Sequence, residues 1–387
     1  MRYLSSAEAA RELGVSLPTL YSYVSRGVLT SYPQAGRKSR LYDADQIAKF
    51  KMRGEILNNA QVTENIMHYG HPVLETQVSG IVDGRLLFRG HDISVLADNS
   101  TAEDVADLLW VGFDSSASLG WIRNELPELA PRGGELDRAL VDCQRWLLSR
   151  IEADQSAYDN SREKIIEIAP LIWRGGASFF FGSALTGRSL HEEIAVVSGL
   201  PDQADCIRKC LVILADHELT ASTFATRVIA STGAPIYQAI SAGLASLNGA
   251  RHLGEVERAY RQFKLLASEG TPELAIRQAQ RRGDQIYGFE HTIYPYGDPR
   301  AEIILELASS LDARDELLSI KHAVGGKTLN FEGAIALLAI SLGKGWSFAT
   351  ALVIASRLIG LIAHCIEEYE QQRMIRPRAR YLAGRSG

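Results

Sequence analysis

The sequence predicts a predominantly α-helical protein with a small helix-turn-helix domain at its N-terminus. Apolar residues recur at a spacing of about 3.6 through most of the chain, which is typical of helices packed on a core. The clearest strand pattern is confined to residues 80–90. No GxGxxG follows a strand and no GxxxxGK[ST] occurs, so Rossmann and P-loop folds lack support. The periodic segments are residues 101–112, 136–152, 206–215, 236–247, 302–311, 333–342 and 348–366.

Charge is divided unevenly along the 387-residue chain, whose net charge is −5. Residues 1–53 contain nine Lys or Arg and four acidic residues (net +5), and the rest contains 32 basic and 42 acidic residues (net −10). A compact basic segment ahead of an acidic body suggests contact with a polyanion. We expect residues 1–53 to form a domain and 54–72 a linker. The linker's His-Tyr-Gly-His has no further ligand nearby, so no metal site is expected.

Two short helices are predicted in the basic segment. Ser5 and Glu8 form a capping box, Gly14 ends the first helix and Ser16 caps the second. A basic stretch over residues 36–47 then has the character of a wing. With its Ala-Ala-x-x-Leu-Gly-Val-Ser core, the segment resembles the MerR-like and excisionase-like winged helix-turn-helix family. The alternative is a helical hairpin that serves assembly alone. The residues expected to meet DNA phosphates are Arg26, Arg37, Lys38 and Arg40.

The remaining general features describe a soluble protein. Asp83-Gly84 predicts a tight hairpin turn within residues 80–90. The four cysteines (143, 206, 210 and 365) have no CxxC or zinc spacing, so we expect buried reduced thiols and a cytoplasmic location. No membrane span is expected, because the most apolar stretch, residues 348–363, is interrupted by Ser356 and Arg357.

Three histidines occupy settings that favour ligand contact. His217 follows an apolar helix, His252 lies between glycines, and His291 follows Gly288. Histidine donates or accepts protons near neutral pH. A lone histidine is more often structural, so each of these signals is weak by itself.

Three arginines accompany the histidines. Arg300 lies nine residues after His291, Arg357 is inside an apolar segment, and Arg376 is near the C-terminus. An unpaired guanidinium inside an apolar segment is costly, so Arg357 needs a carboxylate. An internal acid is one source of it. A multiply anionic ligand is the other, because guanidinium groups bind carboxylates bidentately.

The order and spacing of these residues resemble the citrate synthase family over residues 73–387. The matching stretches are LFRGHDI (87–93), DHELTASTFATRVIASTGA (216–234), GARHLG (249–254), GFEHTIYPYGDPR (288–300), SRLIGLIAH (356–364) and RMIRPRARY (373–381). The resemblance implies an all-α, two-domain helical fold and a homodimer. It implies a large domain over 73–252 and 336–387, and a small domain over 253–335.

The resemblance also implies an activity. The family joins an acyl-CoA to oxaloacetate and hydrolyses the thioester, with acyl-CoA as a substrate and no tightly bound cofactor. His217 and His291 would then hold the oxoacid, and His252 would stabilise the enol of the acyl-CoA. Arg300 and Arg357 would clamp oxoacid carboxylates. Arg376 would reach the site of the partner subunit.

One departure from the family concerns the group that removes a proton from the acyl-CoA. In the family this is an Asp in an Asn-Val-Asp-Phe-like motif, and here Asn330 occupies that position. An amide is not a useful base, so we expect an altered rate or substrate unless another carboxylate substitutes. Glu290, which replaces a family glycine, is the first candidate, ahead of Glu332 and Glu255. Glu332 points away from Asn330 on a regular helix and reaches the same pocket only where the backbone is irregular.

The sequence leaves two classes of function open. The first is a transferase of the citrate synthase type, acting on acetyl-CoA or another acyl-CoA with oxaloacetate or a related 2-oxoacid. The second is a DNA-binding regulator that senses a carboxylate or CoA in a degenerate active site. The order of the histidines and arginines favours the transferase, and the basic head together with Asn330 motivates the regulator.

Overall fold

The computed structural model describes residues 3–25, 29–33, 40–44, 46–47, 74–112, 136–187, 189–268, 272–309 and 327–377. The chain divides into two compact units, Met1–Glu75 and Thr76–Gly387. Each unit is described by itself. The predicted linker over residues 54–72 lies outside the described residues.

The first unit contains the two predicted helices and a small antiparallel sheet. The capping box of Ser5 and Glu8 is present, and Gly14 ends the first helix in the left-handed conformation (φ 64°). The strands pair in the order β1-β3-β2, which gives the helices a sheet to pack on. Its elements are β1 (Tyr3–Ser5), α1 (Ser6–Leu13), α2 (Leu17–Ser25), β2 (Tyr32–Pro33) and β3 (Arg40–Asp43). Its buried residues are Ala9, Ala10, Leu20, Leu29, Tyr42 and Ile47.

The second unit begins with the predicted hairpin. Strands β4 (Ser79–Val82) and β5 (Arg85–Phe88) pair through Asp83 and Gly84. Both turn residues have positive φ (52° and 76°), as a type I′ turn requires. A two-residue strand, β6 (His91–Asp92), extends the sheet.

The other described elements of the second unit are helices, and a helix is present at each of the seven periodic segments. The helices are α5 (Ile93–Asn99), α6 (Ala102–Trp110), α7 (Leu136–Ala153), α8 (Arg162–Phe181), α9 (Leu190–Val197), α10 (Ala204–Ile213), α11 (Ala221–Ala230), α12 (Ile236–Leu247), α13 (Gly254–Ser268), α14 (Pro272–Arg282), α15 (Pro299–Ser309), α17 (Phe331–Ser341) and α18 (Trp346–Gln371), with a 3₁₀ turn at Pro201–Gln203. Among the described residues, six of these helices were not predicted from periodicity, namely α5, α8, α9, α11, α13 and α14.

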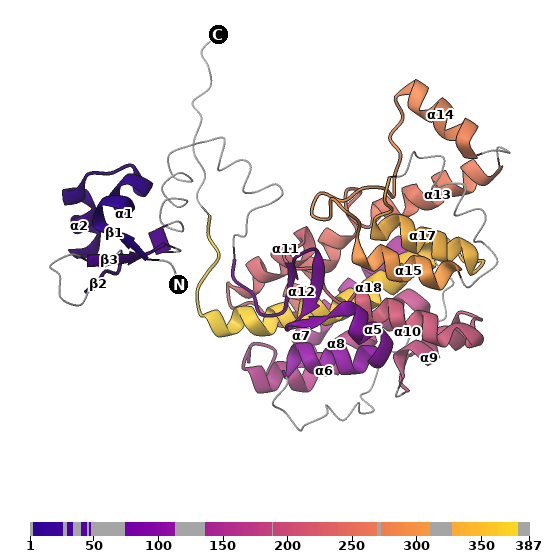
Figure 1. Ribbon diagram of the computed structural model, residues 1–387. Coiled ribbons are helices and arrows are strands. Elements are labelled where there is room, and N and C mark those ends of the chain that lie inside the picture. The colour runs from indigo at the N-terminus through magenta and orange to yellow at the C-terminus, as the bar shows by residue number, and fades with distance from the viewer. Residues whose placement is uncertain are drawn as a thin grey trace, which may run out of the picture. The chain divides into compact units, whose positions relative to one another are not determined.

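Helix α18 runs through the middle of this unit, with other helices around it (Figure 1). It is the one described helix long and apolar enough to cross a membrane, but its most apolar window is entirely buried inside the protein. A buried apolar helix of this length is the core helix of a folded domain. The four cysteines are also buried and free.

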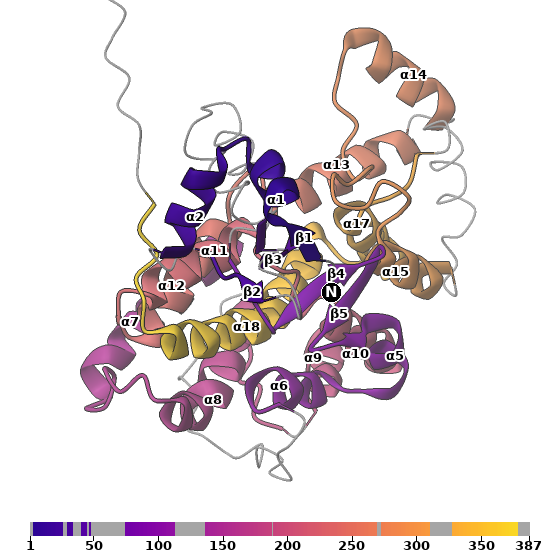
Figure 2. The ribbon, with the colours of Figure 1, turned by 60° about the vertical axis from the view of Figure 1, so that its left-hand side comes forward.

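A second, smaller hydrophobic cluster forms among α13, α14, α15 and α17, which lie together in both views (Figures 1 and 2). Its members come from residues 259–337. This range overlaps the predicted small domain. The predicted boundaries at 252/253 and 335/336 stay predictions, and the second falls inside α17.

Close packing at Gly360 generates the first test. A Cβ at this position would lie within 2.5 Å of the Ala215 carbonyl oxygen and would also collide with the Asp216 carboxylate. We expect Gly360→Ala to lower the free energy of unfolding by about 1–3 kcal/mol, the usual cost of overpacking. Urea denaturation measures this loss. Gly80→Ala is the control, because nothing lies within 4 Å of its added Cβ; an equal loss in both variants would contradict the packing argument.

Candidate active site

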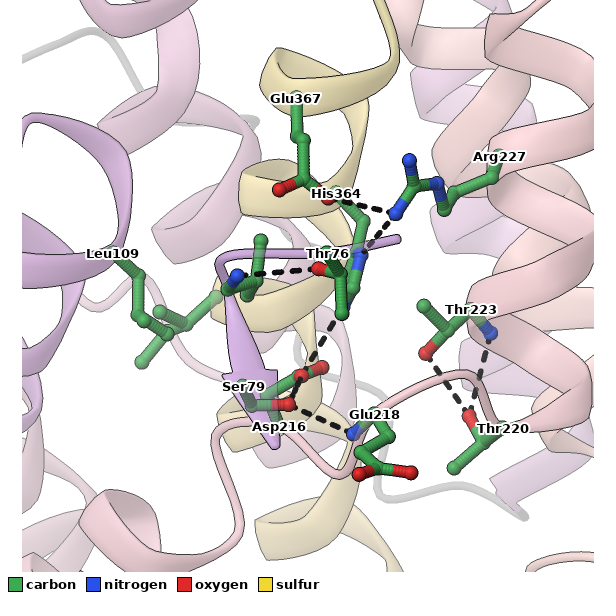
Figure 3. Close-up of polar contacts among 12 residues, drawn as sticks. Thr76, Ser79, Leu109, Asp216, Glu218, Thr220, Thr223, Arg227, His364 and Glu367 are labelled. Atoms are coloured by element: carbon green, nitrogen blue, oxygen red, sulfur yellow. Dashed lines mark hydrogen bonds and ion pairs between the residues drawn. The ribbon is translucent and has the colours of Figure 1, made fainter. Parts of the chain in front are cut away.

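A buried polar network joins α11, α18 and the loop that follows α10 (Figure 3). Arg227 donates to Glu367 and Glu368 of α18 at 2.7 Å each. It also donates to Nδ1 of His364 at 3.5 Å, so the His364 proton lies on Nε2, which donates to Asp216 at 3.1 Å. These contacts fix the residue directly before His217.

The residue after His217 is fixed as well. The Ser79 hydroxyl donates to Asp216, and the backbone N–H of Glu218 donates to Ser79 Oγ at 2.8 Å. Glu218 itself has a left-handed backbone (φ 50°), and its carboxylate accepts from the Ile81 N–H of β4. With both neighbours held, the direction of the His217 side chain is determined by the loop.

His217 and His291 lie together with Tyr294. His217 Nε2 and the Tyr294 hydroxyl are 2.9 Å apart. The rings of His217 and His291 are 5.6 Å apart between centroids, and those of His291 and Tyr294 are 5.1 Å apart. The structure therefore brings together two histidines that are 74 positions apart in the sequence, through a tyrosine that was not predicted from the sequence. The signal that could have found it is its place three positions after His291.

Both histidines are neutral at pH 7. Burial, and then the positive charge of Arg300, lowers the pKa of His291 to about 4 and that of His217 well below its usual value. The Ile293 N–H donates to His291 Nδ1 at 3.2 Å, so the His291 proton lies on Nε2. His291 can thus donate one hydrogen bond to a carbonyl oxygen without carrying charge.

His252 lies at the start of α13 and contacts α11. Its Nε2 is 3.2 Å from the hydroxyl of Ser222. Burial, and then the charge of Arg357, lowers the pKa of His252 to about 4. Ser222 was not predicted either, because it stands in an uninformative Ser/Thr-rich stretch of the sequence.

Arg300 is fully buried and paired. Its Nε and Nη2 donate to the two oxygens of Asp298 at 2.9 and 2.7 Å, and its guanidinium lies 4.3 Å from the Phe331 ring centroid. This fork-to-fork pair orients the guanidinium. The same pair affects the pKa of Asp298. Burial alone would raise this pKa, but the charge and hydrogen bonds of Arg300 bring it below its usual value.

Arg357 has no such pair. It projects from buried α18, and its Nε and Nη1 are buried without a hydrogen-bond partner in the part of the chain that the structure describes. Burial lowers its pKa to about 10, against the attraction of Asp216 and Glu332. The carboxylate that the sequence led us to expect for Arg357 does not bond to these two atoms, so they are open to an anionic ligand.

Asn330 is the N-cap of α17 and both ends of its amide are engaged. Its Oδ1 accepts from the Gly333 N–H at 3.0 Å, and its Nδ2 donates to the Glu290 carbonyl oxygen at 3.2 Å. The loop and the helix can meet closely here because Gly333 has no side chain; a Cβ at this position would collide with Gly288. Asn330 therefore ties the loop of His291 to α17.

The sequence favoured Glu290 over Glu332 as a substitute base, but in the structure Glu290 is exposed and the Glu332 carboxyl is buried. The Glu290 side chain is 64% exposed and pairs with Lys327 at 2.6 Å, so its carboxylate faces solvent. Its backbone is left-handed (φ 58°), the conformation that glycine favours. Glu332, in contrast, has a buried Oε2 that no described residue contacts through a hydrogen bond.

Arg376 is not brought to the cluster within this chain. It is exposed, and its neighbour Ile375 donates its N–H to Ser231 at the end of α11. Ser222 is near the beginning of that helix, so the two ends are about 14 Å apart. In the head, Arg40 is exposed on β3, and Arg26, Arg37 and Lys38 lie outside the described residues. Among the described residues, no group of His, Cys, Asp and Glu is arranged to hold a metal ion.

The depressed pKa of His291 predicts how its protonation affects stability. The folded pKa of about 4 lies below the unfolded value of about 6.5. Between these values the unfolded chain binds more protons, so this contribution to stability is complete above pH 6.5 and declines as the pH falls. We expect His291→Gln to lose less stability than the parent between pH 7 and 5. NMR titration of the His291 ring checks the cause, and an apparent pKa near 6.5 would contradict it.

Comparison with known proteins agrees with this geometry. A sequence model of the citrate synthase C-terminal domain matches residues 186–378, and one of a helix-turn-helix domain matches residues 3–54. The chain is 30% identical to a citrate synthase of Haloferax volcanii (77% of this chain, 89% of the relative). It is also 30% identical to a citrate/2-methylcitrate synthase of Bacillus subtilis (88% and 92%).

The fold is shared with solved structures. One is the ternary complex of the Thermoplasma acidophilum citrate synthase with carboxymethyl coenzyme A and oxaloacetate. It is 22% identical to this chain, with a TM-score of 0.68 over 82% of this chain and 95% of that structure. The relatives at 30% identity, matched over most of their length, show that the chain belongs to the citrate synthase family.

Proposed function

We propose that the protein condenses an acyl-CoA with a 2-oxo dicarboxylate such as oxaloacetate and hydrolyses the resulting thioester. The observation that carries this proposal is the buried guanidinium of Arg357, with two unpartnered nitrogen atoms. It interacts electrostatically with Arg300, and the neutral donor His291 is within the field of Arg300 too. Two cations for carboxylates and one donor for a keto oxygen are the groups that a 2-oxo dicarboxylate requires.

In this reaction the residues divide into two sets. Arg300 and Arg357 hold the carboxylates of the oxoacid, with His217 alongside, and His291 polarises the keto carbonyl through its Nε2 proton. His252 donates to the thioester oxygen of the acyl-CoA as negative charge develops there. A neutral imidazole suits both donor roles, because it matches an oxygen that gains charge only in the transition state.

The identity of the acyl group is part of the proposal. Acetyl-CoA and propionyl-CoA are both candidates, because one of the similar proteins is a citrate/2-methylcitrate synthase. We further propose a homodimer in which Arg376 serves the site of the partner subunit. Four buried free thiols fit a reducing compartment, and we place the protein in the cytoplasm.

Release of the free CoA thiol tests the reaction. With oxaloacetate, we expect thiol release above background from at least one of acetyl-, propionyl- and longer acyl-CoA. We expect His291→Asn to lower that rate by about 10²–10³, the usual loss of one positioned donor to an oxyanion. A thiol-reactive dye measures both rates. The absence of thiol release over the whole panel would contradict the proposed function.

A second candidate, DNA binding by the head, has its own observation. Residues 3–54 match a helix-turn-helix domain and residues 1–53 carry a net charge of +5. Arg40, one of the residues predicted to meet DNA phosphates, is exposed on β3. This function is compatible with turnover, because the two units need not share residues.

Salt-dependent binding tests the second candidate. On DNA from upstream of its own coding sequence, we expect the full chain to bind more weakly as salt rises, because phosphate contacts release counterions. Arg40→Glu is expected to weaken binding about tenfold or more in a low-salt mobility-shift assay. Arg281→Glu, an equal charge change at an exposed site on α14, is the matched control. Equal binding by all three proteins, or binding that salt does not weaken, would contradict DNA recognition by the head.

A further inference from the structure

Condensation requires a base, and the described acids near the pocket are mostly occupied. Both oxygens of Asp298 accept hydrogen bonds from Arg300. The Asp216 Oδ2 accepts from His364 and Ser79, while its Oδ1, which has no partner among the described residues, lies next to Gly360 of α18.

The other three nearby acids are also turned to different partners. Glu218 accepts from the Ile81 N–H of β4. Glu255 is partly exposed beside Arg258, at 3.7 Å, and Glu290 pairs with Lys327 in solvent. None of them presents a buried oxygen without a partner among the described residues.

Glu332 differs from Asp298 and the three acids just named in having a buried carboxylate oxygen without a partner among the described residues. It differs from Asp216 in that no hydrogen bond or ion pair joins its carboxylate to another described residue. Its Oε2 is buried and has no hydrogen-bond partner, and the carboxyl lies within the electrostatic influence of both Arg300 and Arg357. A buried polar atom without a partner is costly and commonly has a functional reason. The unpartnered acceptor of Glu332 and the unpartnered donors of Arg357 are thus both buried and close enough to interact electrostatically.

We propose that Glu332 is the base that removes the α-proton of the acyl-CoA, in place of the carboxylate that Asn330 lacks. The inference rests on the proposed function. The Glu332 carboxylate takes the proton, and the C–H electrons form the enolate, whose oxygen His252 stabilises. The enolate carbon bonds to the keto carbon, and the resulting alkoxide takes up a proton. Glu332 releases its own proton to solvent, and water cleaves the thioester to the acid and the CoA thiol.

The surroundings of Glu332 determine its strength as a base. Helix α17 packs against α13, α15 and α18, and the charged groups that act on Glu332 from these elements are Glu255, Arg300, Arg357 and the neighbouring Asp298. Burial raises the pKa of Glu332 to about 8, against the attraction of Arg300. A carboxylate with a higher pKa accepts a carbon-bound proton more readily, once it is ionised.

Two measurements on the full chain test this assignment. The first is hydrogen–deuterium exchange at the α-carbon of the acyl-CoA that gives the fastest thiol release. It is run in D₂O with L-malate, which has the carboxylates of the oxoacid but no keto carbon to attack. We expect Glu332→Gln to slow exchange by about 10²–10⁴, the contribution of a positioned base. Calorimetry should show that Glu332→Gln still binds oxaloacetate, which also verifies its fold.

The second measurement is the pH dependence of kcat/KM in the parent. A base with a pKa near 8 predicts a rate that rises with pH until about 8 and then levels, whereas a carboxylate of ordinary pKa would give a level rate over that range. The matched control for Glu332→Gln is Glu302→Gln, which makes the same charge change at an exposed position on α15.

The outcomes separate the two proposals. A parent with neither exchange nor thiol release contradicts the proposed function, and the assignment of Glu332 with it. An active parent whose exchange survives Glu332→Gln contradicts Glu332 alone. Loss of exchange in Glu290→Gln with retention in Glu332→Gln would also overturn the assignment, in favour of Glu290.

Discussion

A cation inside the central helix is the constraint on which the rest of the second unit depends. Arg357 projects from a helix whose apolar window is entirely buried, and a lone charge there would cost several kcal/mol. The nearest acid by influence, Asp216, is already bound by His364 and Ser79. The attraction of Asp216 and Glu332 thus offsets part of the cost of burying Arg357. Two of its nitrogen atoms remain without a hydrogen-bond partner among the described residues.

The network around Arg227 makes that arrangement rigid. Arg227 binds two successive acids of α18, and His364 connects it to Asp216. The same helix therefore carries the buried Arg357 and the groups that orient the His217 loop. Gly360 permits the loop to approach because it has no side chain to collide with Ala215 and Asp216. Its N–H then donates to the Ala215 carbonyl oxygen at 3.1 Å. Helix α18 is thus both the core helix of this unit and the element that carries Arg357.

The sequence predicted elements whose signal is local and missed those that depend on packing. The Ser5 capping box and the Asp83-Gly84 turn are encoded within four residues, and both are confirmed. Helix α8 contains Pro170 and two consecutive glycines, which read as helix breakers. In the structure, Trp146 and Leu358 lie over those glycines, so tertiary contacts override the local signal.

The same limit applied to the site. The order of the histidines and arginines was visible in the sequence, but the direction of a side chain near a helix start was not. The angular argument against Glu332 assumed that Asn330 lies in a regular helix. Asn330 is instead an N-cap with extended backbone (φ −90°, ψ 176°), so the helical angle between the two residues does not apply. Only the tertiary structure could show that Glu332 is buried and Glu290 exposed.

The cap also explains why an amide is physically suited to position 330. An N-cap must accept a hydrogen bond from the first turn, which Asn and Asp do equally well. The Glu290 carbonyl oxygen, however, needs a donor, and only the amide supplies one at neutral pH. A carboxylate here would face that oxygen and be repelled. The chain thus ties the His291 loop to α17 through Asn330, and Glu332, with its unpartnered Oε2, is two residues further on. At that position the helix N-terminus favours a negative charge. Burial disfavours the negative charge and outweighs the effect of the helix N-terminus, so the pKa of Glu332 is raised.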